Sequence, residues 1–175
     1  NYKKEVEDIF IKGNLPDEMS LYIHRPSVTD DSVAPKGDDT FYVLACVPHL
    51  GFSKSTDWEL NKETYKSKVL SMLERKLMPG LAKTIKTEFI MTPIDFQNRY
   101  LSTYGSGFSI EPRMFQSAWF RPHNKSEELK NFYLVGAGTH PGPGMPGVMA
   151  SAEILDEVIP AANEFQSEIK VRYRD

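Results

Sequence analysis

The sequence predicts a globular fold of the α+β or α/β class, and three observations lead to this prediction. The chain has 175 residues, which is enough for one ordinary domain with a hydrophobic core. Hydrophobic residues make up 40% of it and charged residues 26%, a composition typical of folded rather than disordered chains. Short apolar runs with strand character alternate with runs at helical spacing, so helices and strands are mixed along the chain.

The first third of the chain predicts one helix and two strands. Apolar residues at helical spacing predict a helix over residues 2–12, which the Gly- and Pro-containing residues 13–17 end. Strands are expected over residues 20–25 and 40–48, and the second is rich in aromatic and β-branched side chains. The loop between them is rich in Pro, Ser, Asp and Gly, and it is long enough for the strands to pair antiparallel.

The longest predicted helix covers residues 61–78, with Asn61 as its N-cap. Pro79 and Gly80 end it. One face of this helix is apolar and the other is charged, as expected for a helix that packs against a sheet. The apolar face consists of Tyr65, Val69, Met72, Leu73 and Leu77.

The remaining chain predicts four more elements. A strand is expected over residues 84–91, and Pro93 opens a short helix that runs through Tyr100. After a Gly- and Ser-rich loop region, residues 131–135 predict a short buried strand. A last helix is expected from near Pro146 through Val158, with a possible kinked extension beyond Pro160.

Several functional classes find no support in the composition. The net charge of −3 is too balanced for a nucleic-acid-binding protein. The four histidines lack metal-ligand spacing, so no metal site is predicted, and no GxSxG motif indicates a hydrolase. The single cysteine, Cys46, follows apolar residues and is expected to be a buried small side chain in a protein from a reducing compartment.

A glycine- and proline-dense segment is the most informative part of the sequence. Residues 132–148 predict an apolar strand, a glycine loop and a helix start, an arrangement that can accept a phosphate group or a polar ring edge. The spacing from Gly136 does not give GxGxxG, because Pro141 occupies the last glycine position, and no P-loop motif is present. On the pattern alone, a ligand site and a rigid surface loop without a ligand are equally compatible.

This segment resembles the carboxyl-terminal flavin motif of the bacterial and fungal phytoene desaturases. The resemblance rests on the run from Tyr133 to Gly142, followed by Gly144, Pro146-Gly147 and Ser151-Ala152. Further motifs occur in the order of that family. They are His24-Arg25-Pro26-Ser27, Ala34-Pro35, Phe41-Tyr42-Val43-Leu44, Val47-Pro48-His49-Leu50-Gly51, Met78-Pro79-Gly80-Leu81, Thr92-Pro93 and Gln116 to Asn124.

The resemblance implies part of an FAD-dependent, amine-oxidase-like fold. Residues 1–115 would form part of a substrate-binding domain with a mixed or antiparallel sheet. Residues 116–162 would supply the closing strand, loop and helix of the FAD-binding domain, and residues 163–175 a tail. The amino-terminal βαβ fingerprint of that family is absent, so we expect the chain to be a carboxyl-terminal fragment that neither binds FAD tightly nor turns over substrate alone.

The resemblance also implies a set of cofactor-binding residues. Gly136 and Gly138 would let the backbone approach FAD, and N–H groups at the helix start would face the flavin ring. Thr139 stands where relatives often carry an acidic residue, and His140 either bonds the cofactor or a water or fixes the loop. The complete set is Gly136, Gly138, Thr139, His140, Met145, Pro146, Gly147 and Val148.

The substrate implied is a carotenoid precursor, a hydrocarbon that requires an apolar binding tunnel. Candidate lining residues are Phe41, Val43, Phe108 and Trp119, although core packing is the more common role for an apolar residue at any one of these positions. No catalytic residue is predicted. Structural ion pairs are expected for Arg25 with Asp30 or for Arg121 with Asp95.

The resemblance places the intact enzyme in the cytoplasm, associated with a membrane surface. No run approaches the ~20 apolar residues of a membrane-spanning helix. A related flavoprotein isomerase or oxidase of carotenoids remains an alternative, as does a free-standing lipid- or nucleotide-binding module. The oligomeric state is not predicted.

Overall fold

The computed structural model describes residues 2–52, 56–111 and 113–161. The chain divides into two compact units, Asn1–Gly105 and Ser106–Asp175, and each is described by itself. The mixture of helices with one small antiparallel sheet agrees with the predicted α+β class.

The first unit opens with the predicted amino-terminal helix. Helix α1 (Tyr2–Glu7) continues into a π-helical turn, Asp8–Lys12, and Gly13 ends it in the left-handed conformation with φ of 69°. The buried carboxylate of Glu5 accepts hydrogen bonds from the backbone N–H (2.7 Å) and the hydroxyl (2.6 Å) of Ser20. Two charge-assisted bonds therefore tie α1 to the start of the sheet.

The sheet consists of two antiparallel strands, as the sequence predicts. Strand β1 (Leu21–His24) pairs with β2 (Tyr42–Ala45), with Leu21 opposite Ala45. The loop that joins them contains two 3₁₀ turns, Pro26–Val28 and Asp31–Val33.

The predicted ion pair of Arg25 with Asp30 is wrong. Arg25 instead pairs with Asp39, where Nε and Nη2 donate to both carboxylate oxygens at 2.8 and 2.9 Å. Asp30 accepts a bond from the backbone N–H of Ser32, so it caps the second 3₁₀ turn. The planar guanidinium favours Asp39, whose carboxylate it meets with two parallel bonds across the base of the loop.

Helix α2 (Trp58–Lys76) begins earlier than the sequence predicts. Its N-cap is Asp57 and not Asn61, because Asp57 Oδ1 accepts the N–H groups of Glu59 (2.9 Å) and Leu60 (3.3 Å). A carboxylate also interacts favourably with the positive end of the helix. The helix ends two residues before Met78, and Leu77, predicted to be on the apolar face, is exposed.

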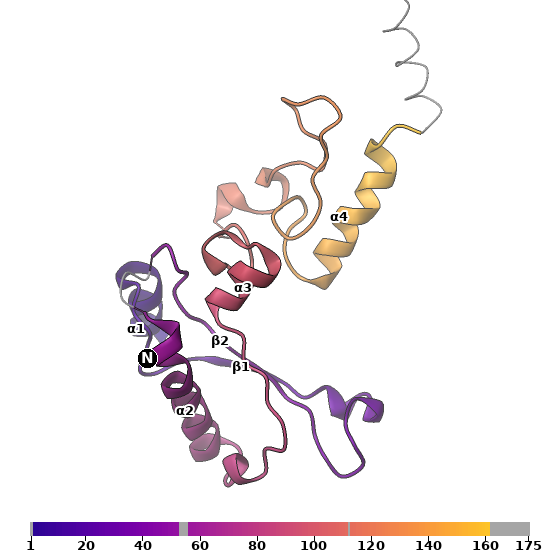
Figure 1. Cartoon of the computed structure of the whole chain (residues 1–175). Coiled ribbons are helices and arrows are strands. Elements are labelled where there is room, and N and C mark those ends of the chain that lie inside the picture. The colour runs from indigo at the N-terminus through magenta and orange to yellow at the C-terminus, as the bar shows by residue number, and fades with distance from the viewer. Residues whose placement is uncertain (1, 53–55, 112, 162–175) are drawn as a thin grey trace, which may run out of the picture. The chain divides into compact units, whose positions relative to one another are not determined.

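The hydrophobic core of the first unit lies between α2 and the sheet. Met19, Trp58 and Tyr65 are buried at its centre, and the rings of Trp58 and Tyr65 meet edge to face at 6.2 Å. Figure 1 shows α2 beside the two strands. The partly buried residues packed around this centre are Leu15, Leu21, Ala45, Val47, Leu50, Val69, Met72 and Ile94.

Burial of Tyr65 gives a prediction about alkaline pH. Its hydroxyl is buried, and within the described residues it has no hydrogen-bond partner. Burial raises the pKa of Tyr65 above its ordinary value of 10. The unfolded chain therefore releases this proton first, and stability falls as the pH rises above about 10. We expect Tyr65→Phe to remove this loss and to be neutral or stabilising at pH 7, by up to about 1 kcal/mol.

Urea unfolding at pH 7 and pH 11 measures this effect. The exposed Tyr22, changed to Phe, is the matched control and should alter neither value. A Tyr65→Phe variant that is clearly less stable at pH 7 would show that the hydroxyl has a partner.

For the segment after α2, the predicted strand is wrong and the predicted helix is confirmed. Residues 84–91 do not form the expected strand, because their backbone forms no β-ladder with another described segment. Helix α3 (Pro93–Tyr100) has the predicted bounds. Asp95 accepts bonds from the backbone and hydroxyl of Thr92 at 2.8 and 2.9 Å, so it caps α3.

The second unit contains little regular structure apart from helix α4 (Met145–Val158), whose bounds agree with the prediction. Two 3₁₀ turns, Met114–Gln116 and Ala118–Phe120, precede it. The expected buried strand at residues 131–135 is wrong. It is reduced to one bridge, between Lys125 and Tyr133, and most of its residues are exposed or half-buried.

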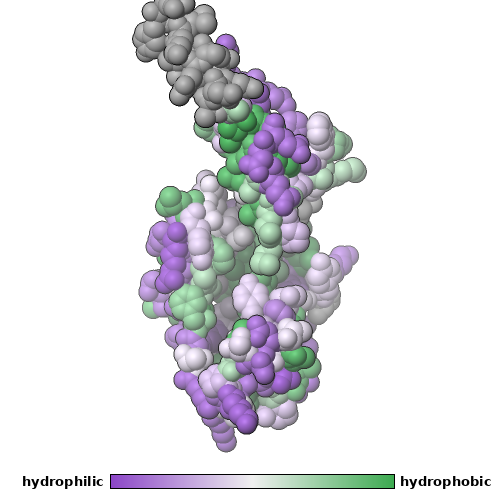
Figure 2. Space-filling view, turned by 90° about the vertical axis from the view of Figure 1, so that its right-hand side faces the viewer, coloured by the Kyte–Doolittle hydropathy of each residue, from purple (hydrophilic) through white to green (hydrophobic). Residues whose placement is uncertain are grey.

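The interiors of the two units differ in chemistry. The buried residues that form the hydrophobic core of the described chain all belong to the first unit, and they are Ile9, Met19, Trp58, Tyr65 and Leu73. The buried side chains of the second unit are polar, and they are Arg121, Asn124, Thr139 and Ser151. Hydrophobic residues also appear on the surface drawn in Figure 2, between polar ones. Hydrogen bonds therefore carry much of the structure of the second unit.

Candidate functional site

The glycine loop is fixed to α4 through one buried hydroxyl group. Ser151, in the second turn of α4, has no exposed surface. Its Oγ accepts the backbone N–H of Gly136 at 2.9 Å and the Nδ2 group of Asn124 at 2.9 Å. It also lies 2.9 Å from the hydroxyl oxygen of Thr139. The start and the middle of the loop therefore converge on one side chain.

The number of available hydrogens gives this network a direction. The carbonyl oxygen of Gly136 can only accept, so the Thr139 hydroxyl donates its one hydrogen there, at 2.9 Å. Ser151 therefore donates its hydroxyl hydrogen to the oxygen of Thr139. A closed circuit thus begins and ends on the backbone of Gly136.

Asn124 extends this circuit to the segment before the loop. The two hydrogens of its Nδ2 group are shared among three oxygens, since the backbone carbonyls of Leu134 and Ser151 also lie 3.1 Å away. The backbone N–H of Leu134 returns a bond to the carbonyl of Asn124 at 2.9 Å. The strand-like segment, the loop and α4 are therefore held by one buried amide.

Arg121 fixes the outer side of the loop. It is buried, and its guanidinium donates to the carbonyls of Ala137 (2.7 Å) and Ile110 (2.9 Å). A side chain added at Gly142 would lie 3.3 Å from its Nε. Arg121 thus fixes the loop through two backbone carbonyl oxygens.

The glycines of the loop serve two different purposes. Gly147 allows close packing, since a Cβ atom there would lie 2.5 Å from the carbonyl oxygen of Gly142. Gly136 and Gly144 have φ of 113° and 95°, and no atom lies within 4 Å of where their Cβ atoms would be. The loop thus has one tightly packed side and open backbone where a ligand can approach.

The start of α4 offers hydrogen-bond donors to this open region. No side chain caps the helix, and Pro146 stands in its first turn. Met145 is exposed. The backbone N–H groups of Met145 and Gly147 have no hydrogen-bond acceptor among the described residues. Free N–H groups at the positive end of a helix suit a phosphate or an electron-rich ring edge. The donor set therefore fits one wall of a flavin site.

The predicted site residues fall into two sets. The eight cofactor-binding candidates all lie in the glycine loop or in the first turn of α4, close to the circuit just described. Of the substrate-lining candidates, Phe41 and Val43 belong to the first unit, and Phe108 and Trp119 to the second. Phe41, Phe108 and Trp119 are exposed, and Val43 is half-buried.

The sequence did not indicate the roles of Ser151, Asn124 and Arg121. All three are polar and buried, which is rare without satisfied hydrogen bonds. The available signal was the position of Ser151, a serine within the otherwise apolar first half of α4. Such a residue indicates a buried polar contact, although its partners come from distant parts of the chain.

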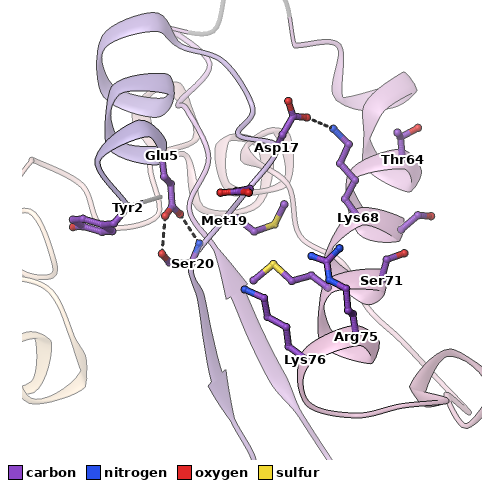
Figure 3. Close-up of a pocket in the computed structure, with 13 residues that line it drawn as sticks. Tyr2, Glu5, Asp17, Met19, Ser20, Thr64, Lys68, Ser71, Arg75 and Lys76 are labelled. Carbon is purple, nitrogen blue, oxygen red and sulfur yellow. Dashed lines mark hydrogen bonds and ion pairs between the residues drawn. The ribbon is translucent and has the colours of Figure 1, made fainter.

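The first unit contains a cavity of about 730 Å³ that is lined largely by polar and charged side chains. Figure 3 shows it between the amino-terminal helix, the residues before β1, and α2. Asp17 pairs with Lys68 across its upper edge at 2.7 Å, and this pair lowers the pKa of Asp17. Its charged lining, with Arg75 and Lys76 at the other end, does not suit a hydrocarbon.

A smaller cavity of about 440 Å³ lies beside Phe41. Pro79 and Leu81 contribute apolar lining, and the guanidinium of Arg25 lies 5.9 Å from the Phe41 ring centre. Phe41 is thus a substrate-lining candidate that borders a cavity.

Cys46 is exposed, so its predicted burial is wrong. It follows Ala45, which packs on the core, and successive residues of an extended chain point to opposite faces. Partial burial and the charge of Glu5 raise the pKa of the thiol, which disfavours the reactive thiolate.

Comparison with known proteins shows extensive sequence similarity. No protein-family model matches the chain. A neurosporene-forming phytoene desaturase of Rhodobacter capsulatus is 60% identical over 161 residues, which is 92% of this chain and 31% of that protein. A lycopene-forming phytoene desaturase of Pseudescherichia vulneris is 49% identical over 152 residues, covering 87% of this chain and 31% of that protein.

More distant similarity extends to desaturases named for another substrate. A 4,4'-diapophytoene desaturase of Staphylococcus haemolyticus is 36% identical over 164 residues, covering 91% of this chain and 32% of that protein. The sequence identity falls from 60% for the neurosporene-forming relative to 36% for the 4,4'-diapophytoene desaturase, while both cover more than 90% of this chain. This chain is thus a homologue of the phytoene desaturases over almost its whole length, and it spans about a third of theirs.

Proposed function

We propose that this chain is the carboxyl-terminal part of an FAD-dependent desaturase of carotenoid biosynthesis, which dehydrogenates phytoene or a similar polyene hydrocarbon. The observation that carries the proposal is the 60% identity to a phytoene desaturase across 92% of the chain. The lower identity to the diapophytoene-acting relative favours phytoene as the substrate.

The glycine loop and the start of α4 would hold part of the flavin. The fit rests on open backbone at Gly136 and Gly144 and on free N–H groups at Met145 and Gly147. FAD, when bound, supplies the acceptor for the two hydrogens that leave the substrate. The role of this chain is to present backbone donors in a shape fixed by Ser151, Thr139 and Asn124.

The proposal assigns residues 1–115 to a substrate-binding domain and residues 116–162 to an FAD-binding domain of an amine-oxidase-like fold. We further propose that the intact protein acts in the cytoplasm at a membrane surface, where hydrocarbon precursors dissolve. Within the described residues, no helix combines the length and the apolar character needed to cross a membrane. Flotation of the intact protein with liposomes tests the association.

Expression of the intact protein in cells that accumulate phytoene tests the activity. Coloured products with longer conjugated systems support the proposal, and unchanged phytoene overturns it. An isomerised product without new double bonds would instead indicate a carotenoid isomerase. The 175-residue chain should yield no product in the same cells, because it would supply only one wall of the flavin site. Submicromolar FAD binding by this chain alone would indicate a free-standing module.

A further inference from the structure

A buried arginine beside the glycine loop has no acidic partner among the described residues. Arg121 is 3% exposed, and its guanidinium donates to the backbone carbonyl oxygens of Ala137 and Ile110. Glu111, which follows Ile110, pairs instead with the exposed Arg113 at 2.6 Å. Within the described chain, the positive charge of Arg121 is therefore met by carbonyl dipoles and not by a carboxylate.

Burial of this charge without a counter-ion is costly. Carbonyl oxygens satisfy hydrogen bonds of a guanidinium, but they do not replace the solvation of its full charge. Arginine cannot escape the cost by losing a proton, because it stays charged at every pH at which proteins fold. Arginine is also rarely buried to this extent unless it is paired. The position of Arg121 therefore favours an anionic partner from outside the described residues.

One edge of the guanidinium is available to such a partner. Nε of Arg121 has no acceptor among the described residues, and it is not fully sealed from water. Gly142 lies beside it with φ of 137°, and a Cβ atom there would lie 3.3 Å from Nε. A residue with a side chain would crowd this edge, whereas glycine leaves it open. A carboxylate is a strong acceptor for a guanidinium N–H group.

Exposed aromatic rings directly precede Arg121 in the chain. Trp119 and Phe120 are 67% and 57% exposed. Phe120 packs edge to face on Phe115, which is 74% exposed, with ring centres 5.4 Å apart. Neighbouring exposed aromatic side chains mark a surface that another part of a protein covers. This chain matches 31% of the Rhodobacter capsulatus desaturase, so most of that protein lies outside the matched region.

We propose that Arg121 anchors an interface within the intact protein. A carboxylate from the part of that protein outside these 175 residues accepts a hydrogen bond from Nε of Arg121 and balances its charge. The same part covers the exposed rings of Phe115, Trp119 and Phe120, which keeps water from the ion pair. This inference rests on the proposed function, because it requires the chain to belong to a longer desaturase.

Double-mutant cycles in the intact protein test the interface. Arg121→Gln removes the charge but keeps an amide N–H₂ group that can donate to a carbonyl. Each aspartate and glutamate outside these 175 residues is changed to its amide, both in the original protein and in Arg121→Gln. We expect one such change to lower the thermal midpoint of the original protein by several degrees. In Arg121→Gln the same change should leave the midpoint unchanged or raise it, because it removes a buried charge that has lost its cation.

Two further variants of this chain complete the design. Arg121→Lys keeps the charge but loses Nε, and it replaces Arg121→Gln if that variant does not fold. The amide change should then lower the midpoint less in Arg121→Lys than in the original protein. Arg113 is the matched control, since it is exposed and already pairs with Glu111. Arg113→Gln should shift the midpoint by no more than about 1 °C and should not couple to any acid outside the chain.

All cycles are measured with and without FAD, so that other anions are distinguished from the proposed carboxylate. A midpoint loss in Arg121→Gln that occurs only with FAD bound would indicate a phosphate group and would overturn the inference. Coupling to Glu164, Glu168 or Asp175 of this chain, or to no acid at all, would overturn it too. An intact protein that neither binds FAD nor desaturates phytoene overturns the proposed function, and this result does not depend on any Arg121 variant.

Discussion

Replacing Gly105 by alanine is expected to destabilise the first unit by about 3–5 kcal/mol. Gly105 follows α3 with φ of 67°, and a Cβ atom there would lie 2.0 Å from the carbonyl oxygen of Pro93. That carbonyl belongs to the first residue of α3, so relief requires movement of the helix itself. The left-handed backbone adds about 1–2 kcal/mol of strain for an alanine.

Gly80→Ala separates these two causes. Gly80 also has a positive φ, 84°, but no atom lies within 4 Å of where its Cβ would be. It should therefore show only the strain of about 1–2 kcal/mol. Thermal unfolding followed by circular dichroism compares the variants, and each kcal/mol corresponds to roughly 4–8 °C in a unit of this size. Equal midpoints for the two variants would show that the contact with Pro93 relaxes without cost.

Replacing Ser151 by alanine is expected to cost about 2 kcal/mol of stability in the second unit. The change removes the acceptor for the partly buried N–H of Gly136 and the donor to the buried hydroxyl of Thr139. A buried N–H without a partner costs about 1–3 kcal/mol, and the higher helix propensity of alanine offsets roughly 0.5 kcal/mol of it. FAD affinity of the intact protein should fall as well, because the loop loses its fixed shape.

Ser67 is the matched control, since it is also a helical serine. It is exposed, and its hydroxyl donates to the carbonyl of Glu63, four residues earlier in α2. Water can replace that bond, so Ser67→Ala should be neutral or stabilising by up to about 0.5 kcal/mol. A Ser151→Ala variant with the same stability as Ser67→Ala would contradict the proposed circuit.

The helices were predictable because their signals are local. Pro93 opens α3 and Pro79-Gly80 follow α2, so nearby residues determine these bounds. The start of α2 was placed wrongly because Asp57 and Asn61 are both suitable caps, and only the structure shows which side chain meets free N–H groups. Residues 84–91 were predicted as a strand from composition, but pairing depends on a distant neighbour that composition does not reveal.

The candidate site was predictable as a segment but not as a structure. Glycine and proline density indicated the loop over residues 136–147, and motif resemblance indicated its ligand. The contacts that shape it join Asn124 and Arg121 to residues 10 to 27 positions away. The spacing of residue types along the sequence does not reveal such distant contacts, so only the structure shows the buried circuit.

The polar interior of the second unit has a consequence for its response to temperature. Unfolding that exposes apolar surface raises the heat capacity, whereas exposure of polar groups lowers it. A unit that buries Arg121, Asn124, Thr139 and Ser151 should therefore unfold with a small heat-capacity change. Its stability curve would be flat, so the loop would keep its shape over a wide temperature range.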